Sequence, residues 1–261
     1  MNIRLKDICF SYEDAPILAQ INCTLKSGLF HAVLGPNGSG KTTLLDIISG
    51  FKPPTRGEVY LDQTKLSGIS RRKISQAVSL VSQDYTINFP FSVYEVILMG
   101  RHPFIDRFSR PSSADMDLAE RALGLTGLHA LKDRKVTELS GGEKQRCVFA
   151  RALCQDSPVL LLDEAFSNMD ISHTIQLLSL IKNEVETRGK TVIAVLHDLN
   201  LAAAWADHIL FLKSGHITKL GPTSEVFTSE NIRSVFDIDV RVEYNDYVKT
   251  KQAYFRKSEH A

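Results

Sequence analysis

The sequence lacks several features that would point to a particular class of protein. Its 31 lysines and arginines nearly balance its 30 aspartates and glutamates, and a net charge of +1 creates no field that would attract nucleic acid or an anionic membrane. No apolar run approaches the roughly 20 residues that a membrane-spanning helix needs. The first residues, MNIRLKDICF, contain no apolar stretch of the kind found in signal peptides. We therefore expect a protein that stays in the cytosol and binds no nucleic acid.

Cysteine is also scarce. The four cysteines are scattered and form no C-x-x-C pair, and they are Cys9, Cys23, Cys147 and Cys154. This spacing is typical of reduced thiols rather than of disulfides or zinc ligands. There is no low-complexity segment and no repeat of 20–50 residues, which excludes a repeat protein. The remaining composition, 43% hydrophobic and 23% charged, is that of an ordinary globular protein.

The hydrophobic pattern predicts strands that later alternate with helices. Short strands are expected at 3–12, 15–25, 29–35 and 57–62, and buried strands at 77–83, 158–164, 191–198 and 208–215. Residues 171–189 form a helical pattern that Gly189 ends, with one apolar stripe made of Ile175, Leu178, Ile181 and Val185. Strand–helix–strand alternation favours a mainly parallel α/β sheet. Residues 86–156 contain helical patterns only, and we interpret them as a helical insert.

One motif identifies a nucleotide site. GPNGSGKTT matches the phosphate-loop pattern G-x-x-x-x-G-K-[ST] and lies between an apolar strand and an amphipathic helix. The glycines let backbone N–H groups face phosphates, and the start of the helix adds partial positive charge. We expect Lys41 to reach the β- and γ-phosphates of a nucleotide and Thr42 to donate its hydroxyl oxygen to Mg²⁺. The full loop is Gly35, Pro36, Asn37, Gly38, Ser39, Gly40, Lys41, Thr42 and Thr43.

Polar residues follow three of the buried strands. In VLLLDE, Asp163 is a candidate ligand of magnesium, and Glu164 is a candidate general base for the attacking water. His197 ends another strand and can hydrogen-bond the γ-phosphate. Gln83 ends a third strand and can contact magnesium or water. Ligands bind at the carboxyl ends of parallel strands, but His197 and Gln83 are also common types of residue after a strand.

A second glycine-rich stretch, LSGGEKQR at 139–146, resembles another phosphate cradle. Ser140 and Glu143 fit the S-x-x-E capping box of a helix, and capping alone explains them. Two consecutive glycines at a helix start cost backbone entropy, however, unless another group must approach the backbone closely. Because the stretch lies in the helical insert, we expect it to serve the same phosphate from the opposite side, supplied by a second molecule.

Across nearly its whole length the chain resembles the ATP-binding-cassette (ABC) subunits of transporters. The phosphate loop, Gln83, LSGGE, LLLDE, SNMD at 167–170 and His197 occur in that family's order. The resemblance implies ATP and Mg²⁺ as cofactors, ATP hydrolysis, and a head-to-tail dimer with two ATP molecules between the phosphate loop of one copy and Ser140, Gly141 and Gly142 of the other. It also implies that Tyr12 stacks on adenine and that Asp170 lies at the dimer seam. SNMD departs from the commoner SALD.

The resemblance also predicts the fold. It implies a phosphate-loop NTPase (RecA-like) core with an N-terminal antiparallel β-subdomain and an inserted α-helical subdomain. We divide the chain accordingly into the β-subdomain and first part of the core (1–85), the helical insert (86–156), the second part of the core (157–240) and a tail (241–261). For the tail we expect a final strand and a solvated end.

The kind of cassette is less constrained. FPFSVYEVILMGRHPF (89–104) and residues 221–240 resemble importers of iron–siderophore complexes, haem and cobalamin. The resemblance then implies separate permease subunits, indirectly a substrate-binding protein, and a peripheral position on the cytoplasmic side of the cell (inner) membrane. Molybdate or tungstate import, export, and a soluble cassette acting on nucleic acid or the ribosome remain alternatives. We expect the permease to dock on Ile97, Leu98 and Arg101, beside a basic cluster that also contains His102, Arg107 and Arg110.

Overall fold

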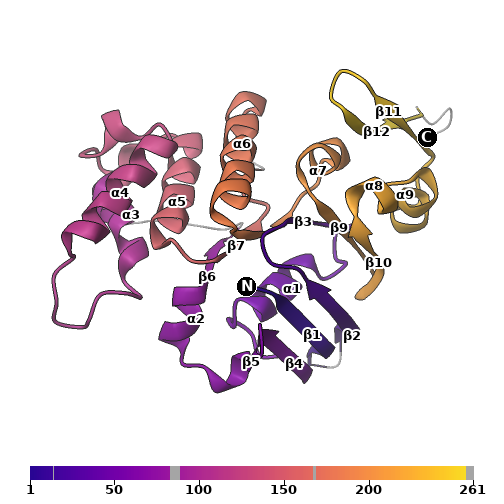
Figure 1. Ribbon diagram of the computed structural model, residues 1–261, viewed down its shortest axis with the longest axis horizontal. Helices are drawn as coiled ribbons and strands as arrows, with labels where there is room; N and C mark the ends of the chain where they lie inside the picture. Colours follow the sequence, from indigo (N-terminus) through magenta and orange to yellow (C-terminus); the bar gives the residue numbers. More distant parts are fainter. Residues whose placement is uncertain (14, 83–88, 167–168, 257–261) are drawn as a thin grey trace.

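A computed structural model describes residues 1–13, 15–82, 89–166 and 169–256. In Figure 1 the helices between residues 93 and 155 lie at one end of the molecule, and the last helices and strands of the described chain lie at the other. The β-strands are β1 (Ile3–Tyr12), β2 (Ala15–Leu25), β3 (Phe30–Leu34), β4 (Arg56–Leu61), β5 (Thr64–Lys65), β6 (Val78–Val81), β7 (Val159–Asp163), β8 (Thr191–Val195), β9 (His208–Lys213), β10 (His216–Pro222), β11 (Val240–Asn245) and β12 (Thr250–Phe255). The α-helices are α1 (Lys41–Ile48), α2 (Arg71–Ala77), α3 (Val93–Leu98), α4 (Ser113–Leu125), α5 (Gly141–Gln155), α6 (Ile171–Arg188), α7 (Leu199–Trp205), α8 (Thr223–Val226) and α9 (Ser229–Phe236).

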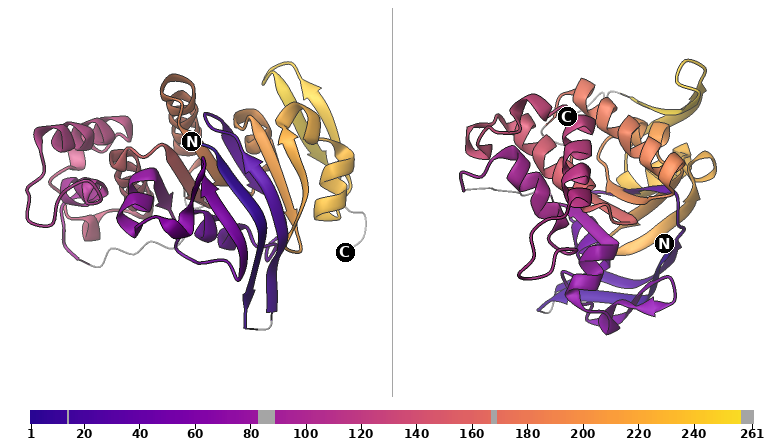
Figure 2. Two further views of the ribbon diagram at one scale, coloured as in Figure 1. Left: turned by 60° about the horizontal axis from the view of Figure 1, so that its bottom comes forward. Right: turned by 60° about the vertical axis from the view of Figure 1, so that its left-hand side comes forward.

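The larger sheet has the order β10-β9-β3-β8-β7-β6. Its neighbours from β9 to β6 pair in parallel, and only β10 runs antiparallel to β9. The smaller sheet has the order β2-β1-β4-β5 and is antiparallel throughout. The left view in Figure 2 shows its two long strands, β1 and β2, beside the larger sheet. The predicted parallel α/β sheet and N-terminal antiparallel sheet are both confirmed.

Apolar side chains cover both faces of the parallel sheet. Along β3, Ala32 and Leu34 belong to one buried cluster, together with α5, α6 and α7, whereas Val33 belongs to a second cluster with α1, β1 and β2. Strands that are buried on both faces read as continuous apolar runs. This explains why the segments around β7 and β8 show no polar alternation in the sequence.

Two details of the elements differ from the sequence predictions. On α6 the buried stripe runs through Thr174, Leu178, Ile181 and Val185, whereas Ile175 is 43% exposed. With 3.6 residues per turn, position 174 lies at the centre of the stripe formed by 178, 181 and 185, whereas position 175 lies about a quarter turn to one side of it. The described part of the tail contains two paired strands, β11 and β12, instead of one final strand.

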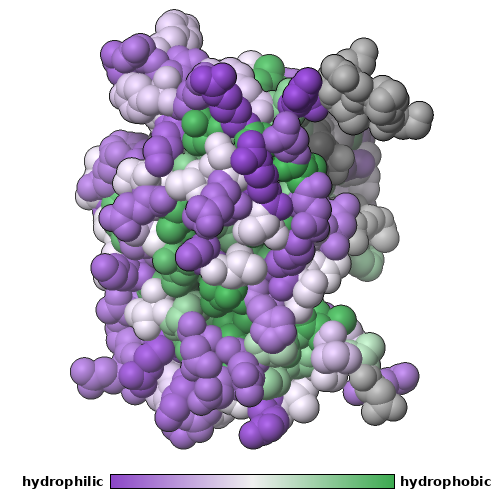
Figure 3. All heavy atoms as spheres, turned by 90° about the vertical axis from the view of Figure 1, so that its right-hand side faces the viewer, coloured by the Kyte–Doolittle hydropathy of each residue, from purple (hydrophilic) through white to green (hydrophobic). Residues whose placement is uncertain are grey.

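The hairpin of β11 and β12 packs on α7 through specific hydrogen bonds. The Asn200 side chain donates to the Ala253 carbonyl and accepts from its N–H, at 3.2 and 2.7 Å. Thr250 donates to the Ala203 carbonyl at 2.9 Å. The face of the molecule on this side is mostly polar, with hydrophobic areas near its middle (Figure 3). In the described part of the chain no helix is both long and apolar enough to cross a membrane.

A buried histidine lies at the start of the parallel sheet, away from the phosphate loop in sequence. His31 on β3 is 0% exposed, its Nε2 donates to the Lys26 carbonyl at 2.8 Å, and its Nδ1 has no hydrogen-bond partner among the described residues. The pKa of His31 is lowered to about 4, chiefly by burial and to a smaller extent by the nearby His208, whereas the Lys26 carbonyl and Asp207 act in the opposite direction. The neutral form is therefore the one that the fold accommodates.

Acidification should consequently destabilise the protein through His31. Between pH 6.5 and about 4 the unfolded chain binds a proton that the folded chain does not, so stability falls as the pH falls through this window, by about 3 kcal/mol in all. We expect His31→Gln to remove this part of the pH dependence. Urea unfolding at pH 7 and pH 5 measures it, with His216→Gln, at an exposed position, as the control. If the free energy of unfolding fell equally between pH 7 and pH 5 in wild type and His31→Gln, this would contradict the assignment.

Candidate functional site

The phosphate loop connects the end of β3 to the start of α1, as the sequence predicts. At Gly35 a Cβ atom would lie 2.0 Å from the Leu212 carbonyl oxygen, so the backbone passes too close to β9 for any side chain. At Gly40 the backbone adopts φ +100°, which favours glycine, and a Cβ would lie 2.7 Å from Leu18. The loop therefore needs glycine at both ends for reasons of space and backbone conformation. The loop leads directly into the N-terminus of α1, whose partial positive charge favours an anion.

Lys41 and Thr42 begin α1 and face the carboxyl end of β7. The Lys41 ammonium donates to the carbonyls of Gly35 and Pro36, each at 3.0 Å. Burial lowers the pKa of Lys41, and the Glu164 and Asp163 carboxylates act in the opposite direction. The Thr42 hydroxyl donates to Asp163 Oδ1 at 3.2 Å. Burial raises the pKa of Asp163, an effect that this hydrogen bond reduces and that the Glu164 charge reinforces.

Glu164 and His197 form a pair. Glu164 follows β7 directly and has a φ of +50°, a conformation that is uncommon for residues other than glycine. Its Oε1 lies 2.7 Å from Nε2 of His197, which comes just after β8. The side chain of Glu164 is largely buried, whereas that of His197 is 47% exposed. The strand ends thus place an acidic and an imidazole group together, beside the loop.

These groups line one cavity of about 430 Å³. Its lining residues are Ile17, Asn37, Gly38, Gly40, Lys41, Thr42, Thr43, Glu164 and His197. Ile17, on β2, is a member that the sequence patterns do not reveal, because only the pairing of β2 brings it to the loop. Tyr12 lies outside this lining, and its hydroxyl accepts a hydrogen bond from Lys52. Its adenine-stacking role stays a prediction.

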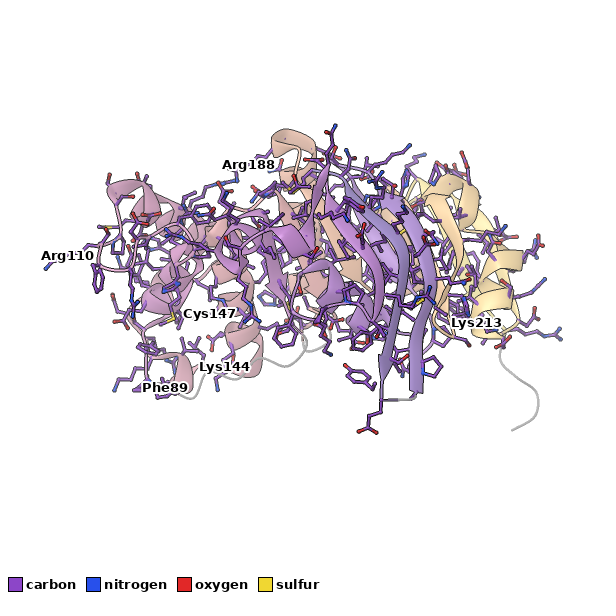
Figure 4. All side chains as sticks on the ribbon, turned by 90° about the horizontal axis from the view of Figure 1, so that it is seen from below. Phe89, Arg110, Lys144, Cys147, Arg188 and Lys213 are labelled. Atoms are coloured by element: carbon purple, nitrogen blue, oxygen red, sulfur yellow. The ribbon has the colours of Figure 1, made fainter. Side chains whose placement is uncertain are left out.

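The second glycine-rich stretch begins α5. Ser140 and Glu143 form the predicted capping box, in which the Ser140 hydroxyl accepts from the Glu143 N–H and the Ser140 N–H donates to the Glu143 carboxylate. A Cβ atom built on Gly141 or Gly142 would meet nothing within 4 Å. Figure 4 shows Lys144, in the first turn of α5, near the edge of the molecule. The glycines are therefore not required by packing within the chain.

Asp170 caps the start of α6. Its carboxylate accepts from the His173 backbone N–H at 3.0 Å and lies 2.6 Å from Nδ1 of the His173 ring. These hydrogen bonds, together with one from Ser172, hold the pKa of Asp170 well below its ordinary value. Gln83, and the first two residues of SNMD, lie outside the described residues. Their predicted roles stay predictions.

Two of the three residues expected to dock the permease are buried in the structure. Ile97 is 0% exposed and belongs to the core, because α3 packs this side against α4 and α5. Arg101 is also buried, its Nε donates to Asp115 Oδ1 at 2.8 Å, and its guanidinium lies over the Phe104 ring. The prediction that Ile97 and Arg101 face a partner is therefore wrong. Arg101 instead joins α4 to the end of α5, where it also donates to the carbonyls of Cys154 and Gln155.

Comparison with known proteins identifies the family. The model of the family described as "ABC transporter" matches residues 18–167. The chain belongs to the ABC transporter family. This confirms the resemblance to ABC subunits that the sequence motifs indicated.

Relatives with curated names are ATP-binding proteins of importers. A hemin import ATP-binding protein of Bradyrhizobium diazoefficiens is 39% identical over 242 residues, covering 90% of this chain and 88% of that protein. A ferric enterobactin transport ATP-binding protein of Escherichia coli is 33% identical over 236 residues, covering 90% and 87%. A cobalamin import ATP-binding protein of Halobacterium salinarum is 37% identical over 226 residues, which cover 87% of this chain but only 56% of that protein.

Solved structures confirm the fold class. An inward-facing putative metal-chelate type ABC transporter matches with a TM-score of 0.82 and 30% identity, covering 97% of this chain and 96% of that one. A dimeric ATP-binding cassette bound to ADP and Pi matches with a TM-score of 0.75 and 29% identity, covering 85% and 98%. The mixed α/β cassette fold with its antiparallel β-subdomain is therefore as predicted. As a member of the ABC transporter family, the chain is an ATP-binding protein.

Proposed function

We propose that this chain is the ATP-hydrolysing subunit of a membrane importer for an iron chelate, haem or cobalamin. The observation that carries the proposal is that Lys41, Thr42, Glu164 and His197 line one cavity, in a chain that belongs to the ABC transporter family. The names of the relatives support the choice of import and of substrate class. The chain then works on the cytoplasmic side of the membrane, bound to separate permease subunits.

The phosphate loop binds the ATP phosphates through its N–H groups and the start of α1. Lys41 turns from the carbonyls of Gly35 and Pro36 to the β- and γ-phosphates. Each carbonyl contact is a single hydrogen bond of 3.0 Å, and a phosphate oxygen is a charged and therefore stronger acceptor. The partial burial that lowers the pKa of Lys41 also strengthens its interaction with an anion.

The residues beside the loop fit a magnesium ion. Thr42 and Asp163 offer a hydroxyl and a carboxylate oxygen, 3.2 Å apart, and oxygen is the ligand type that Mg²⁺ prefers. No group of three or more histidine, cysteine or acidic side chains suited to a metal occurs among the described residues, so phosphates and water would supply the other ligands. When bound, the ion neutralises charge on the phosphates. Gln83 remains a candidate further ligand.

Glu164 acts as general base toward the attacking water. Its largely buried carboxylate stands at the rim of the phosphate cavity, where it can accept the proton that the water loses as it attacks. His197 donates from Nε2 to Glu164 at 2.7 Å. Its Nδ1 hydrogen-bonds the γ-phosphate when both ring nitrogens carry a proton, because Glu164 and the phosphate are both acceptors. The two residues therefore orient the water against the phosphate.

A second copy completes the site. Gly141 and Gly142 present an open backbone at the start of α5, but this helix start does not line the phosphate cavity of its own chain. In a head-to-tail dimer, Ser140 and the two glycines bind the phosphates held by the partner's loop, and Asp170 lies at the seam. Each ATP is then bound between two chains, so that ATP binding drives dimerisation.

Uptake measurements test the proposed function. Cells that lack this chain should lose uptake of a labelled iron chelate, haem or cobalamin, and reintroducing the wild-type chain should restore it. Lys41→Ala should not restore uptake, because the chain no longer holds the phosphates. Normal uptake of all three substrates in the deletion strain would contradict the assignment, and intracellular accumulation of a compound would favour the exporter alternative.

A groove beside the helical segment is a better docking surface for the permease than Ile97 and Arg101. It has a volume of about 680 Å³ and lies between α2, the end of α3 and the following loop. Basic residues of its lining are Arg71, Arg72, His102 and Arg107, and apolar ones include Leu98, Met99 and Ile105. Arg110, of the predicted basic cluster, lies at the outer end of the helical part in Figure 4. We propose that an amphipathic, acidic cytoplasmic helix of the permease occupies this groove.

Changing the groove should uncouple transport from ATP hydrolysis. Met99→Asp with Arg71→Glu introduces carboxylates where an acidic helix docks, and we expect co-purification with the permease and uptake to fall about tenfold or more. Basal ATP hydrolysis by the isolated chain should be unchanged, because neither residue lines the phosphate cavity. Tyr247→Asp, at a position 94% exposed on the distant hairpin, is the control. Full assembly and uptake by the double variant would exclude this groove.

A further inference from the structure

Helix α5 is tied to the segment that follows β7 at two points. The Gln145 side chain donates to the Ala165 carbonyl at 2.9 Å, directly after Glu164. The Arg146 guanidinium lies 3.0 Å from Nε2 of His173, whose Nδ1 lies 2.6 Å from the Asp170 carboxylate. Gln145 and Arg146 lie between one and two turns after Ser140. The start of α5 is thus connected through side chains to both ends of the segment between β7 and α6.

Arg146, His173 and Asp170 form a hydrogen-bonded bridge, and the chemistry of the three side chains fixes which atoms donate and which accept. A guanidinium can only donate, so Nε2 of His173 must be the acceptor and carries no hydrogen. The neutral imidazole then carries its proton on Nδ1 and donates it to Asp170. One ring therefore accepts from α5 and donates to Asp170 at the same time. Neither Asn nor Gln can make both contacts, because each amide reaches only one of the two ring-nitrogen positions.

We propose that His173 is a positioning residue that holds Asp170 and the start of α5 in one fixed arrangement, ready to receive the ATP-loaded loop of a second copy. This inference rests on the proposed function, since it concerns the dimer in which Ser140 and Asp170 face the partner. Two parts of the seam come from different elements, α5 and the N-terminus of α6. If they are already joined, association does not have to order them separately.

The bridge is suited to this role because its members are accessible at the surface. The side chains of Asp170 and His173 are 61% and 36% exposed, so the bridge is not part of the apolar core that stabilises the monomer. The other hydrogen bonds of Asp170, from Ser172 and from the His173 N–H, are local to the start of α6. Among the described residues, the hydrogen-bonded link from Asp170 to α5 runs through the ring of His173. Loss of the ring should therefore change the seam more than the stability of the chain.

The test uses ATP-dependent dimerisation in the Glu164→Gln background, where turnover does not remove ATP. His173→Asn keeps a donor near the Nδ1 position for Asp170 but loses the acceptor for Arg146. We expect it to raise the dimer dissociation constant, measured by sedimentation equilibrium with ATP and Mg²⁺, by about tenfold, the effect of losing a charged hydrogen bond. Binding of a fluorescent ATP analogue to the monomer and the melting temperature should stay unchanged.

Two further variants keep the result interpretable. Ser172→Ala removes a 2.8 Å hydrogen bond to the same carboxylate without touching α5, and it should leave dimerisation nearly unchanged. Arg146→Met breaks the bridge from the α5 side, and it should act non-additively with His173→Asn. If His173→Asn fails to fold, Arg146→Met carries the test alone.

The possible outcomes separate the two proposals. If His173→Asn and Arg146→Met both show the dimer dissociation constant of the Glu164→Gln parent, the proposed role of the bridge is wrong. The proposed function then remains intact. An equal loss in Ser172→Ala would overturn the role of the bridge too, since the effect would then come from Asp170 alone. A Glu164→Gln parent that stays monomeric with ATP and Mg²⁺ would overturn the dimer and the bridge together.

Discussion

Glu164→Gln lowers ATP hydrolysis by about 10²–10⁴-fold, the usual contribution of a general base, while ATP binding is retained. The reason lies in the position of the carboxylate, which stands at the phosphate cavity 2.7 Å from His197. An amide of the same shape cannot accept the proton of the attacking water. The ATP-bound dimer should accumulate because hydrolysis no longer opens it. Sizing chromatography with ATP and Mg²⁺ should therefore show a species of twice the mass.

A matched control separates the base from a general effect of charge. Glu186→Gln makes the same change on α6, where the carboxylate is 62% exposed and is not part of the cavity lining. This variant should hydrolyse ATP at the wild-type rate and remain monomeric after turnover. Hydrolysis by Glu164→Gln at the wild-type rate would remove Glu164 from the mechanism.

Ser140→Arg abolishes ATP hydrolysis by a different route. The arginine side chain fills the open space over Gly141 and Gly142, so the phosphates held by a partner cannot approach the start of α5. Each chain still binds ATP through Lys41 and Thr42, and we expect nucleotide affinity to change by less than about twofold. Hydrolysis should fall at least about 10²-fold, because the composite site no longer forms. The chain should remain monomeric when ATP and Mg²⁺ are added.

The capping role of Ser140 requires its own control. Ser140→Ala removes the hydroxyl that accepts from the Glu143 N–H, which costs about 1 kcal/mol of stability, but leaves the glycines uncovered. Both variants lose the cap, and only Ser140→Arg fills the space. Full hydrolysis by Ser140→Arg would mean that the stretch serves only as a helix cap. Ser140→Ala should lose less hydrolysis than Ser140→Arg, because it removes one hydroxyl but leaves the glycine backbone open to the phosphates.

Local sequence patterns predict the phosphate cavity well because its residues lie directly at the ends of strands or the start of a helix, so that the backbone alone determines their place. The loop between β3 and α1, the two carboxylates at the end of β7 and His197 after β8 all lie at strand ends. Parallel strands bring their carboxyl ends to one edge of the sheet. The contact between Thr42 and Asp163 could therefore be expected from motif and fold class, although 121 residues separate them.

Burial of individual side chains is less predictable, because it depends on which face of an element meets a neighbour. Arg101 reads as part of a basic loop, but Asp115 on α4 lies within 2.8 Å of it and draws it into the interior. Ile97 points into the core for the same reason, since α3 packs on α4 and α5. The His173 bridge shares this difficulty. Arg146 comes from α5, whereas Asp170 and His173 come from the start of α6, and no spacing in the sequence relates Arg146 to the other two.

The central claim is that two glycine-rich cradles from different molecules bind one ATP, and mixing two defective chains tests it most directly. Both chains carry Glu164→Gln; one also carries Ser140→Arg and the other Lys41→Ala. With ATP and Mg²⁺ each alone should stay monomeric, since the first lacks an open second cradle and the second cannot hold the phosphates.

The mixture can form one intact composite site, because the first chain supplies the phosphate loop and the second supplies Ser140, Gly141 and Gly142. Sedimentation equilibrium of differently tagged chains should therefore show an ATP-dependent heterodimer, weaker than the Glu164→Gln homodimer because it has one seam site instead of two. A mixture that stays monomeric under conditions in which the Glu164→Gln chain dimerises would contradict the account.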